Sequence, residues 1–308
     1  MLRVIAVLAV AFALACSDHE LGPGRPVPPP RGLLYAVPDT PGVVIRLAGP
    51  DGAVLNSVQL GDTLYRAIQP LLGPVVSPDG EMLAVTARAQ IPSAGNTFFR
   101  RIFLARMSGT VTSARQTWDS DVEPGTRPSV DSARVSLPLP RFDWSPGGAA
   151  FAVQYEKGDG FGLSFSDPVS GHIGNGFLHT YPDRFGVVAW SPDTAWVLDG
   201  NWLLDTRHQY AHAWTLPDSL VGVGWTPDGR VLATRGCNAG VWSWRMGAST
   251  AEAFLPPPYW YASVSFDGTR ILALTDDCAG QRSAMMLDAH TQGVLWSAAR
   301  ATWAAWRP

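Results

Sequence analysis

"VGWTPDGRVLAT", residues 223–234, places a turn between two apolar runs. Proline presets φ in this turn, and Asp and Gly accept the backbone angles of a tight reversal, so the pattern predicts strand, turn, strand. Near-copies of the stretch recur at five other places: "VVSPDGEMLAV" from Val75, "DWSPGGAAFAV" from Asp143, "AWSPDTAWVL" from Ala189, "SVSFDGTRILAL" from Ser263 and a terminal "AAWRP" that ends at Pro308.

The spacing of the copies predicts the fold. The hydroxyl position is occupied by Ser77, Ser145, Ser191, Thr226 and Ser265, with Arg307 in the last copy, and the successive gaps are 68, 46, 35, 39 and 42 residues. Apart from the first, these gaps approach the roughly 40 to 50 residues of a four-stranded propeller blade. Most copies are followed by a further strand candidate: "FFRRIFLARM", "FGLSFSD", "NWLLDT", "GVWSWRM" and "SAMMLDA".

The two ends of the chain complement each other. The last copy stops after its first strand, whereas residues 33–60 offer three strand candidates, "LLYAV", "GVVIRLA" and "AVLNSVQL", with no turn motif ahead of them. Pairing between the ends would close the ring and remove exposed sheet edges. We therefore predict an all-β chain: a six-bladed β-propeller of four-stranded blades, its last blade closed by N-terminal strands that pair with the C-terminal strand.

With these repeats, residues 33–308 resemble the TolB-like six-bladed propellers with "SPDG" turns, which are related in pattern to WD40 proteins. The resemblance implies a periplasmic protein-binding module, because TolB-like propellers typically act as such modules. The fold alone does not decide function, since propellers include binding modules, peptidase lids and enzymes.

The N-terminus predicts export. Val4–Ala15 is an apolar run of twelve residues, which is too short to cross the ~30 Å hydrocarbon core of a bilayer and is typical of a signal peptide. The sequence "ALAC" before Ser17 resembles the lipobox of bacterial lipoproteins, which implies cleavage after residues 1–15 and a lipid on Cys16. A plain signal peptide or an uncleaved anchor is the alternative. Residues 16–32, rich in proline, are expected to form an extended tether between a membrane and the propeller domain.

Composition and motifs favour a binding protein over an enzyme. The net charge of −3 with no basic run argues against nucleic acid as a partner. The turn aspartates are interpreted as turn formers, "HQYAH" with His208 and His212 lacks the Glu of a zinc "HExxH" motif, and neither "GxSxG" nor a Walker loop occurs. We therefore expect no enzyme, cofactor or metal. The alternative is a propeller hydrolase or lactonase, or a small-ligand sensor, that uses the central channel.

Two cysteines stand at similar places in neighbouring repeats. Cys237 lies eleven residues beyond its turn position and Cys278 thirteen beyond its own. Like positions of adjacent blades come close together, and an exported compartment is oxidising, so a disulfide between them is predicted. Two buried free thiols are the alternative.

Three segments are candidates for partner binding. The 68-residue gap contains a polar insertion, about residues 108–140, expected to be a long loop that includes Trp118 and serves either binding or simple flexibility. "LPPPYWYAS", residues 255–263, offers Tyr259, Trp260 and Tyr261; the alternative for all three is packing under their own blade, which is favoured for Trp260. "HTYPDRFG", residues 179–186, offers Tyr181, Arg184 and Phe185.

These observations together predict a membrane-tethered, extracytoplasmic scaffold or accessory subunit. Its partners would be other envelope or membrane proteins, in an envelope-maintenance or an energy-converting complex.

Overall fold

In the computed structural model, the described residues lie almost entirely in strands and turns. The chain divides into Met1–Pro30 and Arg31–Pro308, and every described residue belongs to the second unit. The described residues are 33–39, 42–48, 53–59, 66–78, 80, 82–90, 98–106, 115–120, 142–148, 151–157, 160–166, 177–179, 187–208, 211–217, 219–276, 278, 282–299, 301 and 303–306.

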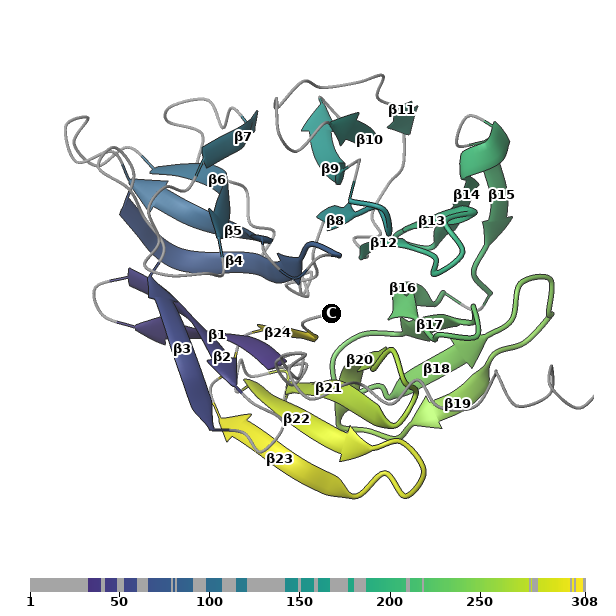
Figure 1. Cartoon of the computed structure of the whole chain (residues 1–308). Helices are drawn as coiled ribbons and strands as arrows, with labels where there is room; N and C mark the ends of the chain where they lie inside the picture. Colours follow the sequence, from purple (N-terminus) through teal and green to yellow (C-terminus); the bar gives the residue numbers. More distant parts are fainter. Residues whose placement is uncertain are drawn as a thin grey trace, which may run out of the picture. The chain divides into compact units, whose positions relative to one another are not determined.

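These residues form six antiparallel sheets of four strands each. Figure 1 shows the sheets following one another around a common centre, with one edge strand of every sheet innermost. The innermost strands are β4 (Arg66–Val76), β8 (Phe142–Trp144), β12 (Val188–Trp190), β16 (Val221–Trp225), β20 (Tyr259–Val264) and β24 (Trp303–Trp306).

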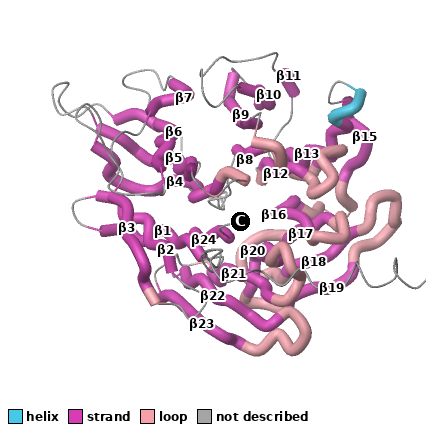
Figure 2. The backbone as a smooth tube through the Cα atoms, in the orientation of Figure 1, coloured by secondary structure: helices cyan, strands magenta, loops and turns pink. Residues whose placement is uncertain are grey.

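The remaining strands extend each sheet outward in the order of the chain. The second strands are β5 (Met82–Gln90), β9 (Phe151–Lys157), β13 (Trp196–Asp199), β17 (Val231–Thr234), β21 (Arg270–Asp276) and β1 (Leu33–Asp39). The third strands are β6 (Phe98–Arg106), β10 (Gly160–Ser166), β14 (Trp202–Asp205), β18 (Val241–Trp244), β22 (Arg282–Asp288) and β2 (Gly42–Ala48). The outermost strands are β7 (Arg115–Ser120), β11 (Phe177–His179), β15 (Ala211–Thr215), β19 (Glu252–Leu255), β23 (Val294–Ala299) and β3 (Val54–Gln59). Figure 2 shows one short helical segment beside the described strands, the 3₁₀ turn Thr206–His208.

The two ends of the described chain meet in one sheet. Strand β24 pairs with β1 in antiparallel register, from Leu33 opposite Trp306 to Ala36 opposite Trp303. The sheet order β24-β1-β2-β3 confirms the predicted closure by N-terminal strands. The all-β, propeller-type architecture predicted from the repeats is likewise confirmed.

The insertion at about residues 108–140 differs from the prediction in one respect. A single long loop was expected, but Arg115–Ser120 is strand β7, which pairs with β6 as the outermost strand of its sheet. An outermost strand pairs with a neighbour along one edge only. A short polar segment, without the alternation of apolar residues that marks a buried strand, can therefore form it. The rest of the insertion lies outside the described residues.

The core lies between the faces of neighbouring sheets. Leu198, Leu232, Trp260 and Leu272 are each 0% exposed, come from three consecutive sheets and belong to one cluster. A Cβ atom on Gly222 would lie 2.5 Å from Cδ2 of Leu198 in the preceding sheet. The glycine therefore permits the close approach that fills the space between β16 and β13.

Candidate binding site in the central channel

Each described innermost strand from β4 to β20 ends in the predicted turn. In each turn the fourth residue donates its N–H to the carbonyl of the hydroxyl residue: Gly80 to Ser77 at 2.8 Å, Gly148 to Ser145 at 2.7 Å, Thr194 to Ser191 at 3.0 Å, Gly229 to Thr226 at 3.0 Å and Gly268 to Ser265 at 2.8 Å. These i to i+3 bonds define β-turns, so the repeated motif forms the reversal that leads out of the channel.

The turn side chains are held by their own turns. The hydroxyl of Ser265 donates to Oδ1 of Asp267 at 2.6 Å and accepts the N–H of Arg270 at 3.0 Å. The hydroxyl of Ser191 donates to Asp193 in the same way, also at 2.6 Å. The hydrogen bond from Ser265, followed by those from Thr269, lowers the pKa of Asp267 to about 2. These contacts agree with the interpretation of the turn aspartates as turn formers; Asp79 lies outside the described residues.

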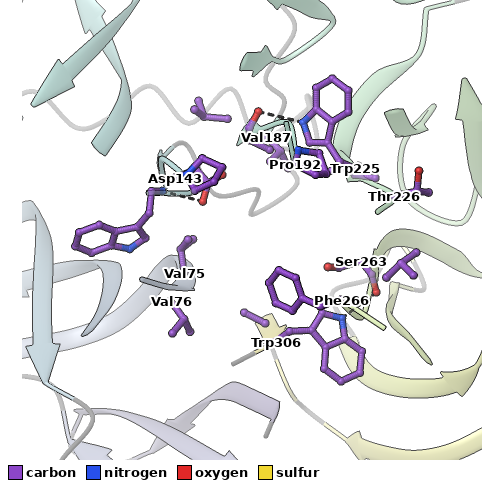
Figure 3. A pocket seen from close by; sticks show the side chains of 18 of the residues that line it. Val75, Val76, Asp143, Val187, Pro192, Trp225, Thr226, Ser263, Phe266 and Trp306 are labelled. Atoms are coloured by element: carbon purple, nitrogen blue, oxygen red, sulfur yellow. Dashed lines mark hydrogen bonds between the residues drawn. The ribbon is translucent and has the colours of Figure 1, made fainter. Parts of the chain in front are cut away.

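A cavity of about 700 Å³ lies where the innermost strands converge (Figure 3). The residue two places before the hydroxyl position of the repeat, which Arg307 occupies in the last copy, lines the cavity in all six copies: Val75, Asp143, Ala189, Gly224, Ser263 and Ala305. The residue after the hydroxyl lines it in five: Pro78, Pro146, Pro192, Pro227 and Phe266. The turn motif thus lines a chamber at one end of the channel as well as joining strands.

Asp143 is the one charged residue among those that line the cavity in the described chain. Its Oδ1 accepts the N–H of Trp144 at 2.9 Å, and its Oδ2 accepts the N–H of Trp190, in the next sheet, at 2.9 Å. The carboxylate therefore links β8 to β12. Burial raises the pKa of Asp143 to about 7, because the loss of hydration outweighs the two N–H bonds, which lower it.

Tyr261 provides the other ionisable group in the wall. Its hydroxyl is hydrogen-bonded to Ser263, and the side chain is 8% exposed. Burial raises the pKa of Tyr261, and the negative charge of Asp143 raises it further, so the phenol stays protonated at neutral pH. The wall thus contains ionisable groups at two places, Asp143 on β8 and Tyr261 on β20, among valine, alanine, proline and aromatic side chains.

The recurrent tryptophans join neighbouring sheets. Nε1 of Trp225 donates to the carbonyl of Ala189 at 3.1 Å, and Nε1 of Trp306 donates to the carbonyl of Ser263 at 3.0 Å. In both cases the acceptor is the cavity-lining residue two places before the turn hydroxyl of the preceding sheet. These bonds hold adjacent innermost strands together around the cavity.

The aromatic residues of the binding candidate at residues 259–261 are largely buried, and for Trp260 this agrees with the alternative of packing under its own blade. Trp260 is 0% exposed within the core, and Tyr261 faces the cavity. The pairing of β20 with β21 shifts register between Tyr259 and Tyr261, and this bulge lets consecutive side chains turn inward. Tyr259 is half-buried, and its hydroxyl lies 3.8 Å from Sδ of Met285.

The side-chain placement of the other partner-binding candidates is not described by the structure. Trp118 belongs to strand β7, and the placement of its side chain is not described. Tyr181, Arg184 and Phe185 lie outside the described residues, as does Cys16.

Cys237 and Cys278 form a disulfide in the structure, with Cα atoms 5.7 Å apart. The bond joins the turn after β17 to the turn after β21, in neighbouring sheets. Asp276 holds the second turn, because its Oδ1 accepts the N–H of Cys278 at 2.8 Å and its Oδ2 pairs with Nε of Arg282 at 2.9 Å. This disulfide lies on the loops and not in the channel wall.

The two histidines of "HQYAH" have separate partners. Nδ1 of His208 lies 2.9 Å from Oδ2 of Asp205, and Nε2 of His212 lies 3.0 Å from Oγ1 of Thr215. Arg207 first, and then His208, hold the pKa of Asp205 well below its usual range. Across the described part of the chain, no three His, Cys, Asp or Glu residues gather as a metal site would require.

The described residues include no helix with the length and apolar character needed to cross a membrane. No protein-family model matches the sequence, and no curated protein matches it.

Solved structures match the fold. The crystal structure of TolB from Acinetobacter baumannii superposes with a TM-score of 0.61 at 14% identity, over 90% of this chain and 67% of that one. A candidate TolB from Agrobacterium tumefaciens gives a TM-score of 0.50 at 15% identity, over 87% of this chain and 89% of that one. A candidate 6-phosphogluconolactonase from Bacteroides uniformis gives 0.50 at 12% identity, over 89% of this chain and 84% of that one. Identities this low show the fold alone, and the chain is therefore a β-propeller with a TolB-like fold.

Proposed function

We propose that the protein is a membrane-tethered, extracytoplasmic propeller that binds other envelope or membrane proteins as a non-catalytic scaffold or accessory subunit. The N-terminal "ALAC" sequence supports lipid attachment at Cys16, and the proline-rich residues 16–32 supply the tether. The resemblance to TolB-like propellers supports protein binding at an extracytoplasmic membrane face.

The observation that carries the non-catalytic part is the lining of the channel. Hydrolysis by paired carboxylates needs an acid and a second carboxylate about 5 to 9.5 Å away. The described lining offers one carboxyl, Asp143, and one phenol, Tyr261. The hydroxyl of Thr226, which also lines the cavity, accepts the N–H of Arg230 at 2.9 Å within its turn. This lining suits binding better than hydrolysis.

Fractionation of a bacterial host tests the tether. The variant Cys16→Ser, which cannot take up a thioether-linked lipid, should move from the membrane fraction to the soluble fraction, while Ser17→Ala should remain with membranes. The far-UV circular dichroism of all three proteins should agree, because the substitutions lie outside the propeller. A Cys16→Ser protein that stays in alkali-washed membranes would contradict lipid tethering and point to an uncleaved apolar anchor.

A further inference from the structure

The channel cavity combines three features that a ligand site needs. It is large enough, at about 700 Å³, for a small organic molecule or a protruding side chain. It opens past the turns, where Phe266 is 62% exposed. Its wall is apolar except at two places, Asp143 on β8 and the Tyr261–Ser263 pair on β20, and Figure 3 shows Asp143 and Ser263 on different sides of the opening.

Among the described residues, no cationic side chain lies in the cavity wall with Asp143. The pKa of Asp143 is set by burial, which raises it, and by the N–H bonds from Trp190 and Trp144, which lower it. The two N–H bonds fix the carboxylate but leave further lone pairs on both oxygens. A carboxylate in an apolar chamber is costly to ionise, and a cation bound beside it would lower that cost.

Aromatic rings surround the same space. Figure 3 shows Trp225, Phe266 and Trp306 on other sides of the opening from Asp143, contributed by β16, by the turn after β20 and by β24. Aromatic faces attract ammonium and guanidinium groups electrostatically, and they also bind apolar groups. A ligand with a cationic group and an apolar body would match both parts of this wall.

We propose that the channel cavity binds an organic cation, an ammonium or guanidinium group on an apolar body, with the charge at Asp143 and the body against the aromatic rings. The proposal is independent of the scaffold role and of the lipid tether. The cation is either a free small molecule or a basic side chain that a partner protein inserts, since both present the same chemistry.

The wall argues against other ligand classes. A hard metal ion such as Ca²⁺ takes about six to eight oxygen ligands, and the described wall offers one carboxylate. A phosphate or carboxylate ligand would need a cationic partner, which the described wall does not contain. A bare apolar ligand would leave the carboxylate uncompensated.

Calorimetry on the full-length protein in a neutral maltoside detergent tests the proposal. The probes are 2-phenylethylammonium and its neutral counterpart 2-phenylethanol, at pH 8. The ammonium should bind saturably with millimolar affinity or better, and at least about tenfold more tightly than the alcohol. Equal affinities, or no saturable binding of the ammonium, would overturn the proposal.

Variants and pH locate the site. Asp143→Asn should abolish the preference for the cation, and Phe266→Ala should weaken ammonium binding several-fold. Val294→Ala, which alters an equally exposed apolar residue on the outer strand β23, should not affect binding.

Because Tyr261 stays protonated and the pKa of Asp143 is about 7, affinity for the ammonium should fall about tenfold from pH 8 to pH 6. If Asp143→Asn does not melt cooperatively and so is not folded, the results for Phe266→Ala and for the pH dependence decide whether the proposal holds. An affinity for the ammonium that does not change with pH would overturn it.

A second pair of probes separates the two sources of the cation. An acetylated, amidated peptide Ala-Phe-Lys-Phe-Ala is compared with the same peptide carrying norleucine in place of lysine. Tighter binding of the lysine peptide than of 2-phenylethylammonium identifies a partner's side chain, and weaker binding identifies a small molecule. If Asp143→Asn does not affect binding of the favoured probe, the assignment of the charge to Asp143 is wrong.

Discussion

The residue two places before the hydroxyl position faces the channel in every copy of the repeat, and in one copy alone it is ionisable. Asp143 occupies the place that Val75, Ala189, Gly224, Ser263 and Ala305 take in the other copies. Above neutral pH, where the carboxyl group is ionised, it has two opposing effects on the stability of the fold. It links β8 to β12 through the N–H of Trp190, and it places a negative charge in an apolar chamber.

This conflict predicts a dependence of stability on pH. The pKa of Asp143 is about 7 in the folded protein and close to 3.8 when unfolded, so between these values the folded state holds a proton that the unfolded state has released. The free energy of unfolding should therefore fall as pH rises from about 4 to 7 and then level off. Urea denaturation at pH 5 and pH 8 should show wild type losing on the order of 2 kcal/mol more than Asp143→Asn. Parallel profiles for the two proteins would contradict the raised pKa.

Thr194 stands where four other turns have glycine, and its φ of 62° lies in the left-handed region. A β-branched residue is strained there, whereas Asn tolerates these angles. Thr194→Asn should raise the free energy of unfolding by about 1 kcal/mol. The matched control is Gly229→Ala, because Gly229 has a φ of 79° and a Cβ added there would meet no atom within 4 Å. This variant should lower the free energy of unfolding by about 1 kcal/mol. Urea denaturation measures both; loss of stability in Thr194→Asn would refute the account of the turn.

At the scale of elements, the disulfide joins two neighbouring sheets through their loops. It closes a segment with a sequence separation of 41 residues, for which the chain-entropy model gives about 4 kcal/mol of stabilisation. The double variant Cys237→Ala/Cys278→Ala should lose about that much in urea denaturation. Dithiothreitol should destabilise wild type and leave the double variant unchanged. A destabilised double variant together with a wild type insensitive to reductant would indicate packing of the thiols instead of a bond.

Strand β20 shows where sequence reasoning reaches its limit. The stretch "YWYAS" has the aromatic content of an interface, and the sequence alone left partner binding and packing under its own blade open for it. The bulge between Tyr259 and Tyr261 breaks the alternation of faces, and Trp260 enters the core as a result. A bulge depends on the pairing with β21, which local sequence does not encode. Strand β2, by contrast, coincides with the predicted segment "GVVIRLA", which Pro41 and Gly49 flank in the sequence.

At the scale of the whole molecule, the sequence predicted the ring because the same turn recurs at blade spacing. The last copy of the repeat has only its first strand and the N-terminal segment supplies three more, which predicted that the two would pair. Strand β24 pairs with β1 as predicted. The cavity was not predicted, although a signal existed: Asp143 differs in character from the residues at the same place in the other copies. That signal gains meaning only once the position is known to face the channel, which requires the arrangement of all the sheets.

The insertion after β7 gives a prediction at this scale. Because β7 completes its sheet, a deletion has to spare Arg115–Ser120 and is confined to residues 121–136. If this segment serves partner binding, the deletion should weaken complex formation by tenfold or more while shifting the melting temperature by only a few degrees, since loop length affects stability weakly. Co-purification from membranes and differential scanning calorimetry measure the two effects. Undiminished complex formation would assign binding to another surface.

The central claim is that this propeller works as a subunit bound to other envelope or membrane proteins. Native mass spectrometry of the protein, extracted from its own membranes in mild detergent, tests this claim most directly. The account predicts a complex of fixed stoichiometry that contains the lipidated propeller and at least one other protein. A lone lipidated monomer at every detergent concentration would contradict it.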